Sequence, residues 1–128
     1  MPTEAMRVSQ PTPLQALRSA LCFSAAGLLV AGLLGVGATP VAVGLVQAPW
    51  DKLAHIGAYA VLTLMLAAGF SGRRPLLATS LAFAVGVIDE AMQAFHPGRH
   101  AGFADLGADL AGALLAATLF WYLWGRRG

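Results

Sequence analysis

The chain has 128 residues, of which 58% are hydrophobic and only 11% are charged. Soluble domains draw about a quarter of their residues from Asp, Glu, Lys and Arg, so this composition excludes an ordinary water-soluble domain and predicts an integral membrane protein. The formal net charge of +2 is too small, and the arginines are too scattered along the chain, for a nucleic-acid-binding protein.

Four apolar stretches follow one another along the chain. They cover about residues 17–38, 53–70, 75–95 and 103–124, and each is close to the roughly 20 residues that a helix needs to cross a bilayer. Because hydrocarbon offers no partners to backbone groups, such stretches must be helical. We therefore predict an all-α fold, in which a polar arm over residues 1–16 precedes a bundle of four transmembrane helices over residues 17–128. We interpret the first stretch as a retained helix and not as a signal peptide.

The basic residues indicate how the chain crosses the membrane. One side collects Arg7, Arg18, Arg73, Arg74, Arg126 and Arg127, whereas the other side has only Lys52 and Arg99. Since positive charge is enriched in cytoplasmic loops, we expect both termini and the arm over residues 1–16 to lie in the cytoplasm. The connection over residues 39–48 is unusually apolar for an aqueous loop, which places it at the outer membrane interface.

Small residues recur at every fourth position in three of the predicted helices. The series are Gly27, Ala31 and Gly35; Ala78, Ala82 and Gly86; and Ala104, Ala108, Gly112 and Ala116. Faces of this kind let membrane helices approach closely, either within one bundle or between copies in a homo-oligomer. The alternative is that an alanine-rich composition produces such series by chance.

Polar residues gather near the outer ends of the second, third and fourth helices. They are Asp51, Asp89, Glu90, Asp105 and Asp109, with His55, His96 and His100. Charged groups at membrane depth are costly unless they pair or line a wet cavity. Their convergence from three separate segments predicts a shared polar pocket that faces outward.

The second helix carries a polar stripe. Asp51, His55 and Tyr59 stand at successive steps of four residues, and Lys52 lies beside them, so one helix face descends from the interface toward the core. Simpler interpretations stay open at this point. His55 could be an interfacial histidine bonded to a carboxylate, Asp51 could cap the helix, and Lys52 could reach the lipid headgroups.

The third helix ends in an adjacent pair of carboxyl groups. Asp89 stands four residues before Gln93, and Glu90 continues the face of Ala82 and Gly86, so Glu90 should point at a neighbouring helix. Two desolvated carboxylates need a cation, a proton or strong donors. The alternative to a functional pair is a structural ion-pair network that locks this end of the bundle.

The third and fourth helices are joined by a tight turn. Pro97 ends the helical pattern, and the turn holds Arg99 at the mouth of the predicted pocket. Arg99 could clamp a phosphate or carboxylate ligand, or pair with Asp89 or Asp105.

In the fourth helix Asp105 and Asp109 stand one turn apart. Asp105 could simply be a negative charge in the first turn that the helix dipole stabilises, whereas Asp109 lies too deep in the helix for that explanation.

The spacing of these residues resembles that of the VanZ-like family. The resemblance covers Trp50 to about Leu115. It rests on Asp51-Lys52-x-x-His55 at the start of the second helix, Asp89-Glu90-x-x-Gln93 at the end of the third, Pro97-x-Arg99 in the turn, and Asp105 followed by Gly112 in the fourth. The chain departs from the family pattern at Asp109, where the family often has Asn, at Met92, where it has a polar residue, and at His100, where it has a small one.

The resemblance implies a multi-pass protein of the bacterial inner membrane within the cell envelope. Some members of the family are linked to antibiotic resistance, in the form of lowered susceptibility to teicoplanin and related lipoglycopeptides. The resemblance supplies no reaction, because no catalytic mechanism belongs to the family as a whole.

Our first functional hypothesis is a membrane protein whose outer pocket binds a cell-envelope or lipoglycopeptide-type ligand, with membrane lipids as its surroundings. Arg99 and Lys52 would clamp an anionic group of that ligand. The candidate ligand-binding residues are Asp51, Lys52, His55, Tyr59, Asp89, Glu90, Gln93, Arg99, Asp105 and Asp109.

The alternative is a membrane-embedded hydrolase or transferase that acts on a lipid-linked substrate. Its candidate catalytic residues are His55, Asp89, Glu90 and Asp105. Since the cluster has no Ser or Cys nucleophile, water would have to be activated, with a divalent metal on His55 and carboxylates as one route. No ligand spacing is diagnostic, so we predict no cofactor and assign no metal ligand. A third hypothesis, a proton-coupled carrier, would use the same carboxylates as a relay.

Overall fold

The computed structural model of the protein describes residues 9–42, 44–98 and 102–127. Four long helices occupy most of them: α1 (Pro13–Gly37), α2 (Trp50–Gly69), α3 (Pro75–Gln93) and α4 (Phe103–Trp124). Two short 3-10 helices, η1 (Pro40–Ala42) and η2 (Gly125–Arg127), follow α1 and α4. The described residues contain no strand, and all four long helices are long and apolar enough to cross a membrane. The prediction of an all-α bundle of four transmembrane helices is confirmed.

Two of the helices begin earlier than their apolar stretches suggested. α1 starts four residues sooner because Thr12 and Gln15 cap it reciprocally: the Thr12 hydroxyl accepts from the Gln15 backbone N–H at 3.2 Å, and the Gln15 side chain accepts from the Thr12 N–H at 2.9 Å. Pro13 occupies the first turn, where its missing N–H costs nothing. α2 starts at Trp50, so Asp51 and Lys52 belong to the helix itself.

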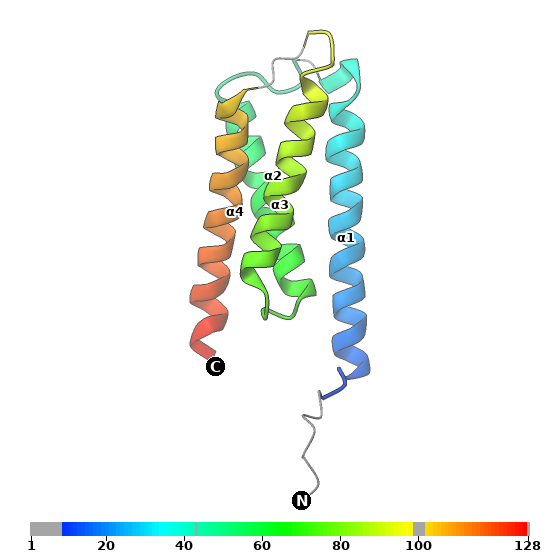
Figure 1. Ribbon diagram of the computed structural model, residues 1–128, viewed down its shortest axis with the longest axis vertical. Helices are drawn as coiled ribbons and strands as arrows, with labels where there is room; N and C mark the ends of the chain where they lie inside the picture. Colours follow the sequence, from blue (N-terminus) through cyan, green and yellow to red (C-terminus); the bar gives the residue numbers. More distant parts are fainter. Residues whose placement is uncertain (1–8, 43, 99–101, 128) are drawn as a thin grey trace, which may run out of the picture.

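The helices form one bundle in which α2 is central. α2 packs against each of the other three, α4 packs on α2 and α3, and α1 packs mainly on α2. Figure 1 shows α1 and α4 at opposite sides of the bundle. The start of α1 and the end of α4 lie at the same end, and the connections from α1 to α2 and from α3 to α4 lie at the other.

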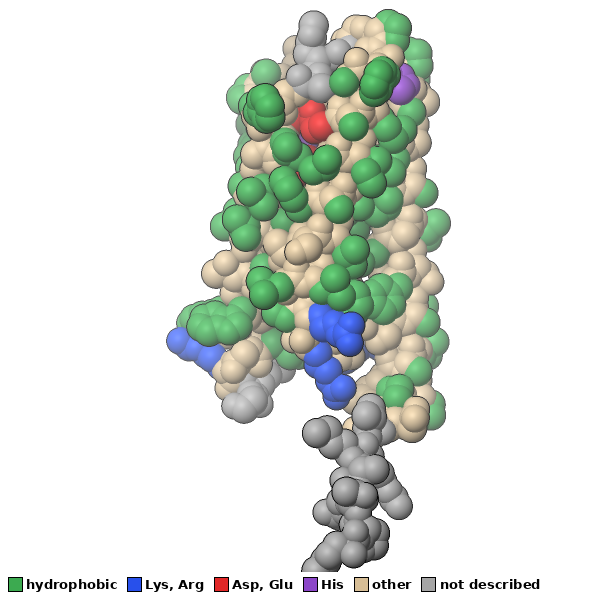
Figure 2. Space-filling model, viewed as in Figure 1, with side chains coloured by type: hydrophobic (Ala, Val, Ile, Leu, Met, Phe, Trp, Pro, Cys, Tyr) green, Lys and Arg blue, Asp and Glu red, His purple; other side chains and the backbone are tan. Residues whose placement is uncertain are grey.

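The two ends of the bundle differ in charge. Basic side chains gather at the end where α1 starts and α4 finishes, whereas acidic and histidine side chains lie toward the opposite end (Figure 2). We call the first the basic end, defined by Arg73, Arg74 and Arg126, and the second the acidic end, defined by Asp51, Glu90 and Asp105. The predicted separation of charge between the two ends is therefore present in the fold.

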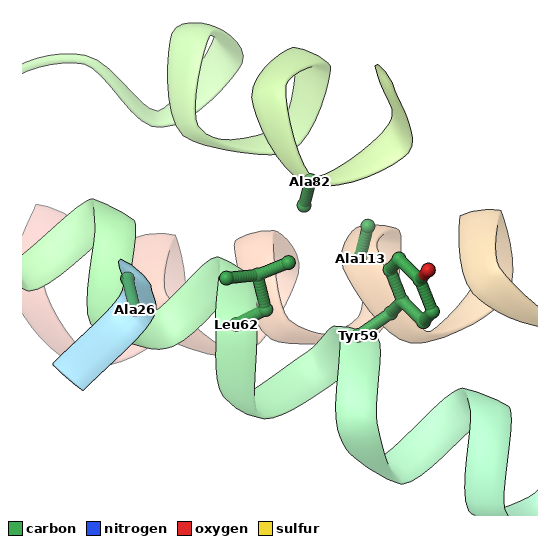
Figure 3. Close-up of a cluster of buried hydrophobic side chains, with 5 residues drawn as sticks. All are labelled: Ala26, Tyr59, Leu62, Ala82 and Ala113. Carbon is green, nitrogen blue, oxygen red and sulfur yellow. The ribbon is translucent and has the colours of Figure 1, made fainter. Parts of the chain in front are cut away.

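Small residues bring the helices together in the centre of the bundle. Ala26, Ala82 and Ala113 come from α1, α3 and α4 and surround Tyr59 and Leu62 of α2 (Figure 3). The closest approach is between α2 and α4, where a Cβ atom on Gly112 would overlap the backbone carbonyl of Ile56. Only glycine at this position permits that distance between the two backbones.

The predicted small-residue faces pack within the bundle in α3 and α4 but not in α1. Ala78, Ala82 and Gly86 are buried, as are Ala108, Gly112 and Ala116, whereas Ala104 is exposed. In α1 all three residues of the series, Gly27, Ala31 and Gly35, are exposed. In α1, Ala26 and its larger neighbours Leu29, Val30 and Leu33 face inward instead. Contact between copies and chance composition therefore stay open as explanations for the series of α1.

Candidate functional site

The acidic end brings together side chains from three helices. α2 supplies Asp51, Lys52, His55 and Tyr59, α3 supplies Asp89, Glu90 and Gln93, and α4 supplies Asp105 and Asp109. Arg99 and His100, which the sequence places in the same cluster, lie outside the described residues. The predicted convergence can therefore be followed at nine of the ten candidate ligand-binding residues.

Two polar contacts join α2 to α4. The Lys52 ammonium group bonds to Asp105, and also to the neighbouring Asp51 at 2.8 Å. One turn deeper, His55 Nδ1 donates to Asp109 Oδ1 at 2.6 Å. The two contacts follow from matched spacing, because residues three or four apart share a helix face.

These contacts decide between interpretations that the sequence left open. His55 is the histidine bonded to a carboxylate, and Lys52 turns to two carboxylates of the protein. Asp51 does not cap α2: the N-cap residue is Pro49, and no side chain caps the helix. Asp51 instead lies in the first turn, where a negative charge favours the helix dipole.

The adjacent carboxyl groups of α3 take different partners. Gln93 Nε2 donates to Asp89 Oδ2 at 3.0 Å, as their four-residue spacing suggested, and both side chains are buried. Glu90 Oε2 accepts from the backbone N–H of Gly102 at 3.0 Å. Glu90 is only 7% exposed, so the prediction that it points into the bundle is confirmed.

Asp109 is the most deeply placed carboxyl group of the cluster, with no exposed surface. It fits between α3 and α4 because Gly86 faces it: a Cβ atom on Gly86 would lie 2.8 Å from Asp109 Oδ2. Oδ2 has no hydrogen-bond partner within the described part of the chain. The role of Gly86 as the space for a carboxylate was missed by the sequence analysis, although its place in a small-residue series was the available signal.

Tyr59 ends the polar stripe of α2 and is fully buried. Its ring lies parallel to the His55 ring, with the ring centroids 6.2 Å apart. The Tyr59 hydroxyl, like Asp51 Oδ1, finds no hydrogen-bond partner among the residues described. A buried hydroxyl usually has such a partner, so this group is available to a bound molecule.

A pocket of about 460 Å³ lies between α1, α2, α3 and the connection that follows α1. Its polar lining consists of Asp51, His55, Tyr59, Asp89 and Gln93. Its apolar lining includes Leu28, Leu29, Leu33, Val36, Leu45 and Val46. Lys52, Glu90, Asp105 and Asp109 do not line this pocket. They join the helices instead: Lys52 contacts Asp105, Asp109 contacts His55, and Glu90 bonds to Gly102 at the start of α4. The contribution of α1 to the pocket was not predicted from the sequence.

Three side chains of the cluster have the chemistry of metal ligands and lie close together. His55, Glu90 and Asp109 each offer one ligand atom, and these atoms lie within 4.8 Å of one another. They come from α2, α3 and α4, so no short sequence spacing could have indicated the group.

Comparison with known proteins gives a family. No curated protein and no solved structure matches the chain. A family model described as VanZ/LLP1 matches residues 4–124, which extends the resemblance found between Trp50 and Leu115 to α1 and to the end of α4. The four-helix membrane bundle with its acidic end is thus a member of the VanZ/LLP1 family.

Proposed function

We propose that this protein binds an amphiphilic ligand in the pocket between α1, α2 and α3. The observation that carries the proposal is the division of the pocket into an apolar wall, from α1 and the connection after it, and a polar wall, from α2 and α3. A volume of about 460 Å³ is within the range of pockets for small ligands, roughly 300–1,000 Å³. A lipid-linked cell-envelope molecule or a lipoglycopeptide has an apolar chain for the apolar wall and a polar head for the polar wall.

The apolar wall supports entry of the ligand from the bilayer. Leu28 of the spanning helix α1 lines the pocket and is 76% exposed, and Leu45, in the connection after α1, also lines it and is 65% exposed. In a membrane protein, exposed apolar side chains of a spanning helix meet lipid and not water. An acyl chain could therefore reach the pocket sideways, between α1 and α3, without crossing an aqueous phase.

The polar wall favours a ligand that donates hydrogen bonds. Asp51 Oδ1 and the Tyr59 hydroxyl are the pocket groups that lack a partner among the described residues, and a carboxylate can only accept. Lys52, which we expected to clamp an anion, is held by two carboxylates of the protein. Hydroxyl and amino groups of a sugar or peptide suit this wall better than a bare phosphate does.

We place the protein in the bacterial inner membrane, with the basic end in the cytoplasm and the pocket facing outward. Support comes from Arg18, Arg73, Arg74 and Arg126 at the basic end against Lys52 at the acidic end, because positive charge is enriched on the cytoplasmic side. Family resemblance supports a link to lipoglycopeptide susceptibility. Reporter fusions to the C-terminus test the orientation: a fluorescent protein that folds only in the cytoplasm should be active, and an active periplasmic phosphatase fusion would reverse it.

Ligand binding is tested with a fluorescent lipoglycopeptide and the same glycopeptide without its acyl chain, on purified protein in nanodiscs. The acylated probe should bind at least tenfold more tightly. Leu33→Trp, which fills the pocket, should weaken its binding at least tenfold, and Tyr59→Phe by about fivefold, the value of one hydrogen bond of roughly 1 kcal/mol. Leu114→Trp, on an exposed face of α4 outside the pocket, is the matched control. Equal binding by wild type and Leu33→Trp would refute the proposal.

A second candidate function is hydrolysis or group transfer on a lipid-linked substrate. The observation that favours it is the contact between His55 Nδ1 and Asp109 Oδ1, since a buried carboxylate that orients an imidazole is a common arrangement for a general base. Under this hypothesis His55 would activate water. Incubation with a radiolabelled lipid-linked cell-wall precursor should then release a water-soluble product, and His55→Asn should abolish that release. If the wild-type protein binds the precursor but releases no product, the enzymatic hypothesis is refuted and ligand binding stays as the proposed function.

We also propose that copies of the chain associate through the exposed small residues of α1. Gly27, Ala31 and Gly35 have no role in packing the bundle, and a face of this composition suits close contact with a second helix in lipid.

A further inference from the structure

One group within the polar cluster is only partly explained by the pocket and by the contact between His55 and Asp109. His55, Glu90 and Asp109 bring one imidazole and two carboxylates within 4.8 Å of one another, and they reach this point from three different helices. Glu90 and Asp109 do not line the amphiphile pocket. Their burial therefore needs a reason other than contact with that ligand.

Both carboxylates have an oxygen left over. Asp109 uses Oδ1 for His55, and Glu90 uses Oε2 for the Gly102 N–H. The second oxygens, Asp109 Oδ2 and Glu90 Oε1, are buried and lack a hydrogen-bond partner within the described residues. The two side chains are 0% and 7% exposed. A buried carboxylate oxygen without a partner is expensive, and more so in a membrane.

The excess of negative charge at the acidic end also favours a bound cation. Asp51, Asp89, Glu90, Asp105 and Asp109 are five acidic side chains, and Lys52 is the one Lys or Arg that the described residues place at this end. Lys52 is already engaged by Asp51 and Asp105. A cation between Glu90 and Asp109 would supply both positive charge and partners for the two free oxygens.

The donor set selects the kind of cation. Mg²⁺ and Ca²⁺ prefer sites made of oxygen alone, whereas an imidazole nitrogen beside carboxylates suits first-row divalent metals, among which Zn²⁺ binds strongly. Three protein ligands also leave a coordination position open. Metal–ligand bonds are about 2.0–2.2 Å long, so the side chains would rotate inward from their present spacing when the ion binds.

We propose that His55, Glu90 and Asp109 form a binding site for a divalent transition metal of the Zn²⁺ type. The metal would tie α2, α3 and α4 together at His55, which also lines the polar wall of the pocket. The inference goes beyond the proposed ligand binding and does not depend on it, because metal binding is measured with the ion alone.

The test uses full-length protein, purified in detergent, stripped with a chelator and titrated with Zn²⁺ by calorimetry. Wild type should bind one Zn²⁺ per chain, and Glu90→Gln and Asp109→Asn should each weaken binding at least tenfold, because an amide is a poor ligand for this metal. His96→Ala is the matched control: His96 also lies at the acidic end, but its Nδ1 donates to the Met92 carbonyl at 2.7 Å. Its variant should bind Zn²⁺ as wild type does. Mg²⁺ at the same concentration should not compete.

A second measurement keeps the proposal testable where a variant folds poorly. A ligand that binds only the folded state raises its stability, so Zn²⁺ should raise the thermal unfolding midpoint of the wild-type protein, and a chelator should reverse the rise. Absence of Zn²⁺ binding by folded wild type, or equal affinity in wild type, Glu90→Gln and Asp109→Asn, would overturn the metal site. Neither result would affect the binding of the lipoglycopeptide probe.

Discussion

The acidic and basic ends of the bundle are held together by different kinds of contact. At the basic end the contacts are aromatic and apolar: the rings of Phe23 in α1 and Phe70 at the end of α2 meet edge to face with centroids 5.0 Å apart, and Phe120 of α4 packs with Ala67 of α2 and Ala78 of α3. At the acidic end the contacts are polar, and they pair Lys52 with Asp105 and His55 with Asp109. Both ends belong to the same four helices, so the difference comes from side chains and not from topology.

The acidic end is the one whose side chains need an explanation beyond holding the helices together. Apolar and small side chains are enough to hold membrane helices together, as the basic end demonstrates. Charged groups at membrane depth are costly and are retained mainly at functional places. If the acidic end served only to join the helices, a few more alanines would have done so at lower cost. The pocket and the cluster of His55, Glu90 and Asp109 are therefore better explained by ligands than by stability.

The largest expected effect comes from disrupting the close approach of α2 and α4 at Gly112. Gly112→Ala places a Cβ atom on the Ile56 carbonyl and should lower the free energy of unfolding by about 2–3 kcal/mol, as overpacking does. Because Ile56 follows His55 and Gly112 lies one turn from Asp109, the same change should separate that pair and weaken Zn²⁺ binding.

Gly107→Ala is the matched control for this change. Gly107 is in the same helix but has open space beside it, so alanine there should be neutral or stabilise by roughly 0.5–1 kcal/mol through helix propensity. Thermal unfolding in detergent compares the two variants. Equal stability of Gly112→Ala and Gly107→Ala would contradict the close approach of α2 and α4.

A second change separates stability from function. Phe120 is 6% exposed and packs at the basic end, so Phe120→Ala should destabilise the protein by about 1–2 kcal/mol. This is less than in a soluble core, because lipid also solvates the apolar side chain in the unfolded reference state. Zn²⁺ and lipoglycopeptide affinity should stay unchanged in the folded protein. Leu119→Ala, which removes a half-exposed side chain, serves as the control, and loss of ligand affinity in Phe120→Ala alone would show that the two ends are coupled.

A third experiment measures the polar contact itself. A double-mutant cycle of His55→Ala and Asp109→Ala, in the presence of a chelator, should give a coupling energy of about 0.6–1.7 kcal/mol, which runs from the average to the maximum found for hydrogen bonds between membrane helices. The unfolding free energies of wild type, both single variants and the double variant supply the cycle. A coupling near zero would mean that the 2.6 Å contact contributes nothing to stability, and the pair would then matter only for a ligand.

Much of the fold could be predicted because lipid simplifies the problem. Four stretches of about 20 apolar residues must be helices, and polar residues such as Asp51 and Glu90 mark the end at which they converge. Helix starts were harder to predict, since Thr12, Pro13 and Gln15 cap α1 with residues that look like part of a polar arm.

The site was predictable by residue type but not by partner. The sequence identified His55 and Asp109 as members of one cluster, yet their pairing depends on the register of α2 against α4, which Gly112 fixes at a distance in the chain. The grouping of His55, Glu90 and Asp109 likewise requires three helices in place. The apolar wall from α1 was not predicted, because Leu28 and Leu33 look like any other leucines of a membrane helix.

The smallest expected effect on the stability of the bundle comes from a substitution in the middle of α1, away from both ends. Ala31 is exposed in the middle of the small-residue face, so Ala31→Leu should change the unfolding of the single chain by less than about 0.5 kcal/mol, as substitutions away from packed positions do. If α1 joins two copies, however, the added side chain would hold the facing helices apart. Sedimentation in detergent should then show dimers for wild type and monomers for Ala31→Leu.

Ala104→Leu provides the matched substitution, because Ala104 is an exposed small residue on α4 and should leave the dimer intact. Monomers for wild type, or dimers for both variants, would remove the association through α1. In that case the exposed glycines of α1 would mark a helix that packs loosely on α2 and faces lipid. Such a helix could yield sideways to admit a ligand into the pocket that it lines.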